Sequence, residues 1–240
     1  MIKFWSPQSF DKKTLSDWTI QSYEQILPYV EQFLCAKHPF RDGSICPFVP
    51  NALRADRIFF VEGFGKSIDD ISRAEELIME SISLLEDRKA RLGGFCSVII
   101  LFEHNFEVSR LLEIHRDNRM SCITRGLMIG ALYPTSQAPS LHNALYFPLR
   151  TPVPTLVLRD MVPNDLIFVD PSVENPKNKL AFLKQFLTLF KSGGSENTEK
   201  LLAEARVLKK KYERIQLLTR ASIGLLLFIA LSMLFLLFVS

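Results

Sequence analysis

The chain has 240 residues, of which 48% are hydrophobic and 23% charged, a composition typical of a globular domain with a further appendage. Its formal net charge of +3 comes from residues 195–220, which carry seven basic and four acidic side chains, whereas residues 1–194 carry 22 of each. Because the body has no excess basicity, we expect no nucleic-acid partner. The four cysteines are expected to be reduced in the cytosol, so we predict no disulfide framework.

Helical and strand patterns alternate along the first 190 residues. Helical spacing extends from Thr14 to Ala36, where Pro28 predicts a kink or a break, and it recurs at 49–56, 67–90, 105–118, 163–169 and 177–191. Runs rich in apolar and branched residues predict strands at 57–64, 95–102, 126–133 and 155–161. The alternation predicts an α/β (α+β) domain over residues 1–191, with a mixed sheet of about four strands and flanking helices.

Two proline-rich loops interrupt this pattern, "HPFRDGSICPFVPNAL" (38–53) and "PTSQAPSLHNALYFPLRTPV" (134–153). An irregular stretch as long as the second is usually functional or disordered, and its apolar content argues against disorder. We expect the two loops to line a shared pocket.

Residues 192–220 read as a hinge followed by a basic amphipathic stalk helix. The hinge contains Gly193 and Gly194, and apolar side chains then recur by four and three at Leu201, Ala205, Leu208, Tyr212 and Ile215. The repeat lasts only about two heptads. It fits a stalk that leads straight into the next segment or folds back on the domain, and it also fits a homodimer formed through residues 198–219.

The segment "ASIGLLLFIALSMLFLLFVS", residues 221–240, carries no charged side chain. Twenty helical residues span about 30 Å, the thickness of a bilayer core, so we predict a transmembrane helix. The preceding basic residues predict that the N-terminal domain is cytoplasmic and the chain a single-pass, tail-anchored protein of the cell inner membrane. We expect the bilayer as a partner, with anionic lipid headgroups contacted by Lys209, Lys210, Lys211 and Arg214.

Cys35, His38 and Cys46 are the only close cluster of metal-ligand residue types. A structural zinc site normally uses four ligands in two close pairs, and Cys46 has no near partner. Its thiol could equally pack as a small apolar group. The sequence contains no phosphate-binding glycine loop, serine-hydrolase elbow or dinucleotide fingerprint.

The remaining candidates are polar side chains on the two loops and on the last strand: His38, Cys46, His142, Asn143, Arg150 and Arg159. Arginine on a stiff loop is suited to binding a carboxylate or phosphate through two hydrogen bonds. Histidine or cysteine could ligate a haem iron. The structural alternative makes Arg150 and Arg159 salt-bridge partners and His142 a hydrogen-bonding loop residue.

The "HP…CPFVP" motif at 38–50 and the block "GLMIGALYPTSQAPSLHNALYFPLRTPVPTLVLRDMV" at 126–162 resemble an uncharacterised bacterial domain family. That family is distantly similar to the YqcI/YcgG proteins, whose members include haem-dependent N-hydroxylases of guanidine-containing small molecules. The resemblance implies haem as a cofactor, with His38 or His142 as an axial ligand. It also matches Gly126, Gly130 and Asp165, whereas Tyr133 and Asp160 stand where the family pattern has histidines.

Our leading hypothesis is a tail-anchored bacterial protein whose cytosolic domain binds a small molecule or haem. The resemblance implies a haem-dependent oxidation of a small substrate, which Arg150 and Arg159 would orient. The alternative is a non-enzymatic, membrane-tethered sensor or adaptor, in which the same residues only support the fold.

Overall fold

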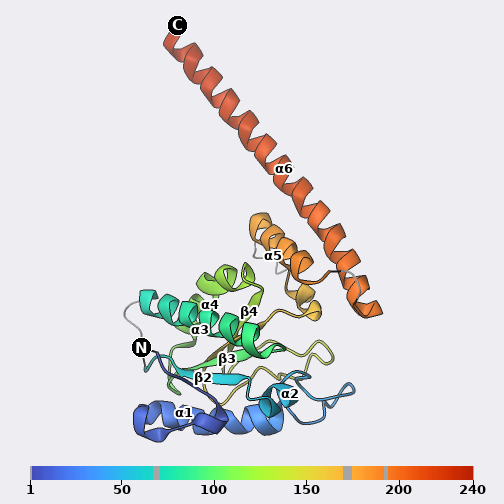
Figure 1. Cartoon of the computed structure of the whole chain (residues 1–240). Coiled ribbons are helices and arrows are strands. Elements are labelled where there is room, and N and C mark those ends of the chain that lie inside the picture. Colours follow the sequence, from blue (N-terminus) through green and yellow to red (C-terminus); the bar gives the residue numbers. More distant parts are fainter. Residues whose placement is uncertain (1, 67–70, 170–174, 192–193, 240) are drawn as a thin grey trace. The chain divides into compact units, whose positions relative to one another are not determined.

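The computed structural model describes residues 2–66, 71–169, 175–191 and 194–239, and it describes no side chains for residues 71, 220 and 223–239. The chain divides into two compact units (Figure 1). The first contains Met1–Cys122 and Leu127–Asp160, and the second contains Ile123–Gly126 and Met161–Ser240.

The first unit is built on a five-stranded mixed sheet. Its strands are β1 (Phe4–Trp5), β2 (Ile58–Glu62), β3 (Ser97–Leu101), β4 (Leu127–Leu132) and β5 (Thr155–Asp160), in the spatial order β1-β2-β3-β5-β4. Only the β2–β3 pair is parallel, because a helix returns the chain to the same end of the sheet. The four predicted strands are confirmed, and the sheet gains β1 at its edge.

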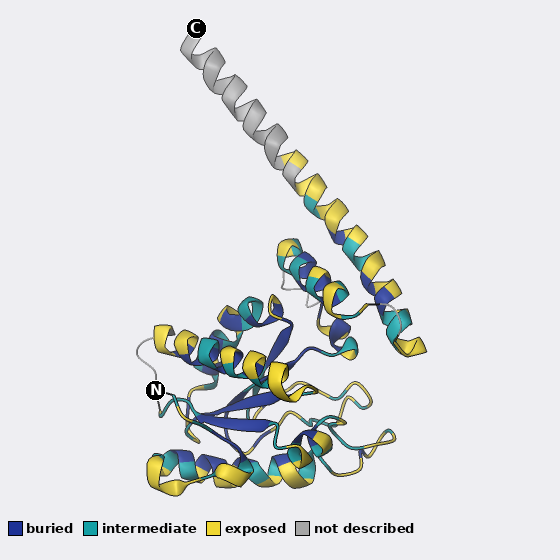
Figure 2. Cartoon of the chain, viewed as in Figure 1, coloured by how far each residue is buried: buried dark blue, intermediate teal, exposed yellow. Residues whose placement is uncertain are grey.

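Alternate residues of the strands enter two separate hydrophobic cores. Phe59, Val61, Val98 and Ile100 belong to one core, whereas Ile58, Phe60, Ile99 and Leu101 belong to the other. The sheet is therefore buried on both faces, which explains the continuous apolar runs of β2 and β3. Figure 1 shows α1 below the sheet and α3 and α4 above it, and Figure 2 shows the strands as the buried centre of this unit.

The helices of this layer structure are α1 (Asp17–Pro28), α2 (Val49–Arg54), α3 (Ile71–Leu92) and α4 (Val108–Ile123). Short 3₁₀ turns precede α1 at Pro7–Ser9 and Lys12–Thr14. The predicted interruption at Pro28 is confirmed, because α1 ends there and residues Tyr29–Phe33 continue as a π-helical segment. Its Leu34 N–H bonds to the Tyr29 carbonyl at 2.9 Å, five residues back.

The second unit contains the 3₁₀ segment η4 (Pro163–Val169), α5 (Pro176–Leu189) and the long helix α6 (Glu196–Val239). In this unit α6 contacts both α5 and η4. Leu202, Ala205 and Tyr212 of α6 are buried. Part of the predicted apolar repeat is thus covered within the chain.

Within the part of the chain that the structure describes, no helix is both long and apolar enough to cross a membrane. Most of the predicted span, residues 223–240, lies outside the residues whose side chains are described.

Candidate functional site

The first loop, residues 37–47, folds into a short hairpin after the π-helical segment. Backbone hydrogen bonds close it from His38 N to Gly43 O (2.8 Å), from Ile45 N to Ala36 O (2.9 Å) and from Cys46 N to Leu34 O (2.9 Å). Gly43 makes the turn at φ +87°, a conformation that side-chain-bearing residues rarely adopt. The hairpin fixes the positions of His38 and Cys46.

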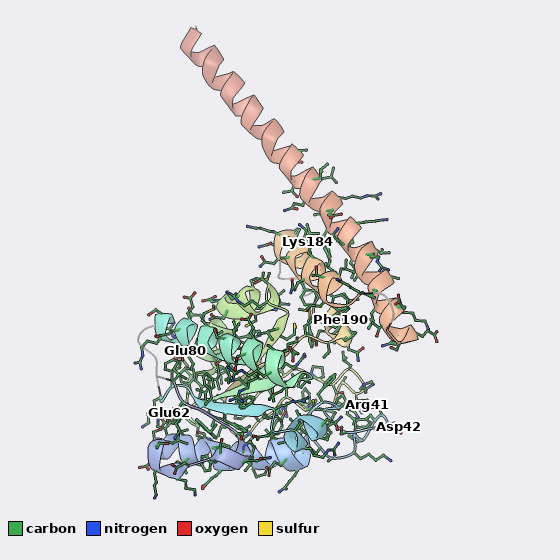
Figure 3. All side chains as sticks on the ribbon, viewed as in Figure 1. Arg41, Asp42, Glu62, Glu80, Lys184 and Phe190 are labelled. Carbon is green, nitrogen blue, oxygen red and sulfur yellow. The ribbon has the colours of Figure 1, made fainter. Side chains whose placement is uncertain are left out.

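The Arg41 guanidinium stabilises this hairpin through hydrogen bonds to its backbone carbonyls. Its Nη1 donates to the Asp42 carbonyl at 2.7 Å, and its Nη2 donates to the carbonyls of Ser44 (2.6 Å) and Ile45 (2.9 Å). The fork that could grip a carboxylate is therefore engaged with backbone. Figure 3 labels Arg41 and its neighbour Asp42 on this loop.

The second loop, residues 134–153, is braced in the same way by Arg150. Its Nε donates to the Ser136 carbonyl at 2.8 Å, and its guanidinium lies 4.0 Å from the centre of the Phe147 ring. Arg150 thus joins the two ends of the loop. Arg150 therefore has a structural role, but its partners are a backbone carbonyl and an aromatic ring and not the carboxylate of the expected salt bridge.

Asn143 and Ser140 shape the tip of the second loop. The Asn143 Oδ1 accepts from Leu145 N at 2.7 Å, and the Ser140 hydroxyl accepts from His142 N at 3.2 Å. Such side-chain bonds to a backbone N–H two residues ahead are the usual way in which Asn and Ser stabilise turns. The Asn143 side-chain oxygen is consequently used by the turn itself.

Aromatic rings hold the two loops together. The His38 ring meets the His142 ring at 5.3 Å and the Tyr146 ring at 5.4 Å, both edge to face, and Phe40 meets Tyr146 at 5.6 Å. The Tyr29 hydroxyl donates to the Pro148 carbonyl at 2.6 Å. The two loops are therefore in contact, and the shared pocket expected between them stays a prediction.

His38 is the buried member of this ring cluster, with 4% of its surface exposed. Burial lowers the pKa of His38 from 6.5, and Arg41 and His142 lower it further. Its Nδ1 accepts a hydrogen bond from Phe40 N at 3.0 Å, so the neutral ring carries its proton on Nε2. In this conformation His38 offers a hydrogen-bond donor, whereas a metal ligand needs a free lone pair on that nitrogen.

Cys46 and Cys35 lie beside this cluster, both half-buried and both free thiols. Burial raises the pKa of the Cys35 thiol, and neighbouring Cys46 and Glu31 raise it further, so Cys35 is protonated and a poor nucleophile. Cys46 packs against the hydrophobic core beneath the sheet. Among the described residues, no group of three or more His, Cys, Asp or Glu side chains could hold a metal ion.

Arg159 lies toward the end of β5 that is far from the second loop. It is the fifth residue of β5, whose first residue, Thr155, follows the second loop, and a strand rises about 3.4 Å per residue. Its Nη1 donates to the carbonyl of its neighbour Asp160 at 2.9 Å. Arg159 is therefore separated from the second loop by most of the length of β5.

Two further positions of the motif block, Asp160 and Gly126, have roles in holding the fold together. The Asp160 carboxylate accepts from Lys89 Nζ at 2.6 Å and from the buried Cys96 N–H at 3.1 Å, which ties β5 to α3 and β3. Gly126 has φ +75°, and a Cβ there would lie 2.9 Å from the Leu189 side chain.

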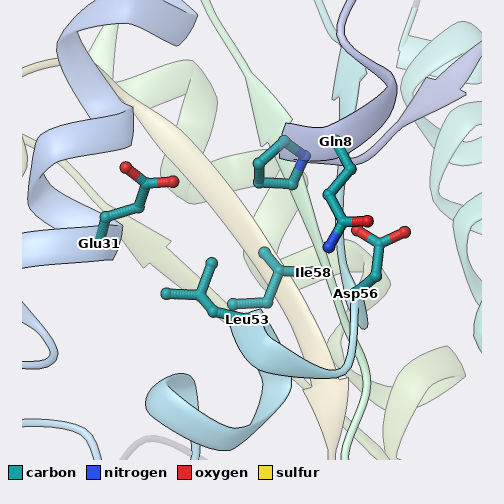
Figure 4. A pocket seen from close by; sticks show the side chains of 6 residues that line it. Gln8, Glu31, Leu53, Asp56 and Ile58 are labelled. Carbon is teal, nitrogen blue, oxygen red and sulfur yellow. The ribbon is translucent and has the colours of Figure 1, made fainter.

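A cleft of about 290 Å³ opens elsewhere on the first unit (Figure 4). It is lined by Pro7, Gln8, Glu31, Leu53, Asp56 and Ile58. None of the six predicted site residues lines it, so the expectation of a pocket lined by the two loops is not met by this cleft.

Residues 23–200 match a family described as "Domain of unknown function (DUF6875)". The chain belongs to this family. The match covers both loops and every strand except β1, and it ends before the apolar segment at 221–240. No curated protein and no solved structure matches the chain.

In this DUF6875 domain, sequence reasoning missed the residues that join the loops, Tyr29, Phe40 and Tyr146. The aromatic content of the two loops could have indicated Phe40 and Tyr146, whereas Tyr29 lies outside both loops, in the π-helical segment. It also missed four exposed apolar side chains at the same place, Phe40, Leu141, Leu145 and Leu149. We call the exposed part of residues 37–47 and 134–153 the two-loop surface.

Proposed function

We propose that the protein is a membrane-anchored recognition module. Residues 221–240 cross the bilayer as a single helix, and the DUF6875 domain presents the two-loop surface to a partner on the cytoplasmic side of the inner membrane. The uncharged twenty-residue segment supports the anchor. The preceding cations Lys209, Lys210, Lys211 and Arg214 support the orientation and a contact with anionic headgroups.

A single observation favours recognition over catalysis. Two of the polar side chains expected at the site, Asn143 and Arg150, bond to loop backbone, as Arg41 of the first loop does. The side chains exposed at the same place are apolar, with Leu141 77% and Leu145 88% exposed. An exposed apolar group of this kind is typical of an interaction surface.

The anchor is tested by alkaline carbonate extraction of membranes from cells that express the full chain or a chain ending at residue 220. We expect the full chain to remain in the membrane pellet and the shorter chain to be released. Release of both chains would contradict the anchor.

Haem or small-molecule binding, with oxidation of a small substrate, is the second candidate function. It is favoured by His142, whose exposed ring lies 5.3 Å from the His38 ring and has no hydrogen bond to the described residues. The residues present fit one imidazole ligand, that of His142, because Nδ1 of His38 accepts a hydrogen bond from Phe40 N and its Nε2 therefore carries the proton.

Haem titration of the full chain in detergent separates the two candidates. The recognition module predicts no Soret band, and it predicts that Ala at His38, Cys46 or Arg150 lowers the melting temperature only. A Soret band that forms with the wild-type chain and is lost in His142→Ala would support the haem candidate instead.

A further inference from the structure

The leucines of the second loop are held outward by the loop's own geometry. Leu141 and Leu145 flank the Asn143 turn, and Leu145 N is bonded to the Asn143 side chain. Their exposure exceeds that of the apolar residues on α3 and α4 of the same unit, Leu92 at 43% and Leu112 at 40%. The two-loop surface therefore displays apolar side chains that no packing within the unit uses.

Because the loops are already held in place, binding through these leucines should cost little conformational entropy. Arg150 joins the ends of the second loop, and the ring contacts of His38 join it to the first. A partner that covers the leucines does not have to order the loop, so little conformational entropy is lost.

The two loops carry a net positive charge. The two loops contain Lys37, Arg41 and Arg150 against a single acidic residue, Asp42, a net charge of +2. The second loop contains no acidic residue at all. The rest of residues 1–194 is correspondingly net negative.

We propose that the two-loop surface binds the bilayer surface, with Leu141 and Leu145 inserted at the headgroup boundary and Lys37 and Arg150 next to anionic lipid headgroups. Exposed leucines and aromatic rings beside cations are the combination that interfacial membrane segments use. The inference rests on the proposed anchor in one respect, because a span in the same chain keeps a bilayer at high effective concentration. A protein partner would match the leucines equally well, and the local positive charge favours the lipid surface.

The experiment measures amide hydrogen exchange of the full chain in phosphatidylcholine vesicles with and without phosphatidylglycerol. We expect residues 140–150 to exchange at least severalfold more slowly in the anionic vesicles than in the neutral ones. The double variant Leu141→Ser/Leu145→Ser should lose this protection, and Lys37→Gln, which removes one positive charge from the same surface, should weaken it.

The matched control is Leu92→Ser/Leu112→Ser, which removes two exposed leucines from the helices of the same unit. It should keep the protection. Equal exchange in both vesicle types, or protection that survives in Leu141→Ser/Leu145→Ser, would overturn the proposal. Protection that follows protein density and ignores lipid charge would assign the surface to a second copy of the chain, which also overturns it.

Failure of the anchor and failure of this inference are distinguishable. If carbonate releases the full chain, the same chain can be floated with anionic vesicles. Flotation that depends on Leu141 and Leu145 would then support the lipid surface without the anchor. Flotation of the wild-type chain and of the serine variant to the same extent would contradict it.

Discussion

At the scale of single residues, the arginines of the loops are used as braces. Arg150 bonds to the Ser136 carbonyl and stacks on Phe147, so one side chain links residues near the two ends of the loop. Lysine carries the same charge without the Nε donor or the planar group that stacks. The role of Arg150 therefore depends on its shape as well as on its charge.

We predict that Arg150→Ala lowers the free energy of unfolding of the first unit by about 1–2 kcal/mol, the sum of one hydrogen bond and one cation–π contact. Arg150→Lys should not restore it. Urea denaturation followed by circular dichroism measures the change. Arg116→Ala is the control, because its guanidinium is exposed and pairs with Asp117 alone, and an equal loss there would contradict the bracing role.

The lowered pKa of His38 predicts a pH dependence of stability. The unfolded chain binds a proton on this ring near pH 6.5, whereas the folded chain does so only at lower pH. The free energy of unfolding should therefore fall as the pH drops below about 6.5 and stay level with respect to this group above it.

His38→Asn should flatten this fall in denaturation series measured between about pH 5 and pH 8. The Asn Oδ1 can still accept the hydrogen bond from Phe40 N. Burial also lowers the pKa of His115, so part of the slope should remain until His115 is replaced as well. A slope that His38→Asn leaves unchanged would show that His38 does not supply it.

At the scale of elements, the close pairing of β2 with β3 depends on Gly63, which directly follows β2. Its N–H donates to the Leu101 carbonyl at 2.9 Å, and a Cβ at this position would lie 2.4 Å from the same oxygen. A side chain here must push the strands apart, because the neighbouring atom is backbone and cannot move by itself. Glycine is therefore required here so that the backbone of residue 63 can approach the Leu101 carbonyl.

We predict that Gly63→Ala destabilises the first unit by about 1–3 kcal/mol through this overlap. Gly130→Ala is the matched control, since the nearest atom to its Cβ is Leu132 Cδ1 at an ordinary 3.6 Å. Its effect should stay within about 0.5 kcal/mol. Thermal melts of both variants make the comparison, and equal losses would argue against the overlap.

The strands were predictable because burial on both faces of the sheet leaves a strong mark on the sequence, as in β3, where every residue is buried. β1 was missed because a strand of two residues, Phe4–Trp5, carries no readable periodicity. The two loops were recognised from their prolines and polar residues. Their use of Arg150 and Asn143 as braces depends on three-dimensional distances, which no sequence spacing states.

At the scale of the whole molecule, the long helix α6 contains both a segment that packs on α5 and the predicted span. Its first half packs on α5, where the buried Tyr212 ring lies 5.0 Å from Lys179 Nζ, and its second half contains the predicted span. Two alternatives were open for the stalk, packing within the chain and dimerisation. Ala205 and Tyr212 are buried within the chain, where α6 contacts α5 and η4.

We predict that Tyr212→Ala destabilises the second unit by about 3 kcal/mol, the usual range for deleting a buried aromatic side chain. Amide exchange should rise in α5 and in the first half of α6. Val207→Ala is the control, because that side chain is 68% exposed on the same helix. Unchanged exchange in Tyr212→Ala would mean that the ring does not hold the two helices together.

The homodimer through residues 198–219 stays a prediction. Two of its five seam positions, Ala205 and Tyr212, are buried within the chain. Outside the seam, α6 also carries the exposed apolar side chains Val207, Leu217 and Leu218. Comparing the sizes of chains that end at residue 194 and at residue 220 tests it, with a dimer expected only for the longer chain.

The sequence by itself determined the alternation of helices and strands, the break at Pro28, the two special loops and the charge pattern near residue 221, because each depends on near neighbours in the chain. Only the tertiary structure decided that His38, His142 and Tyr146 form one cluster. Only the structure showed that the loop polar groups face backbone and the leucines face outward. Those outcomes depend on which distant residues fold together, and a local pattern carries no record of that.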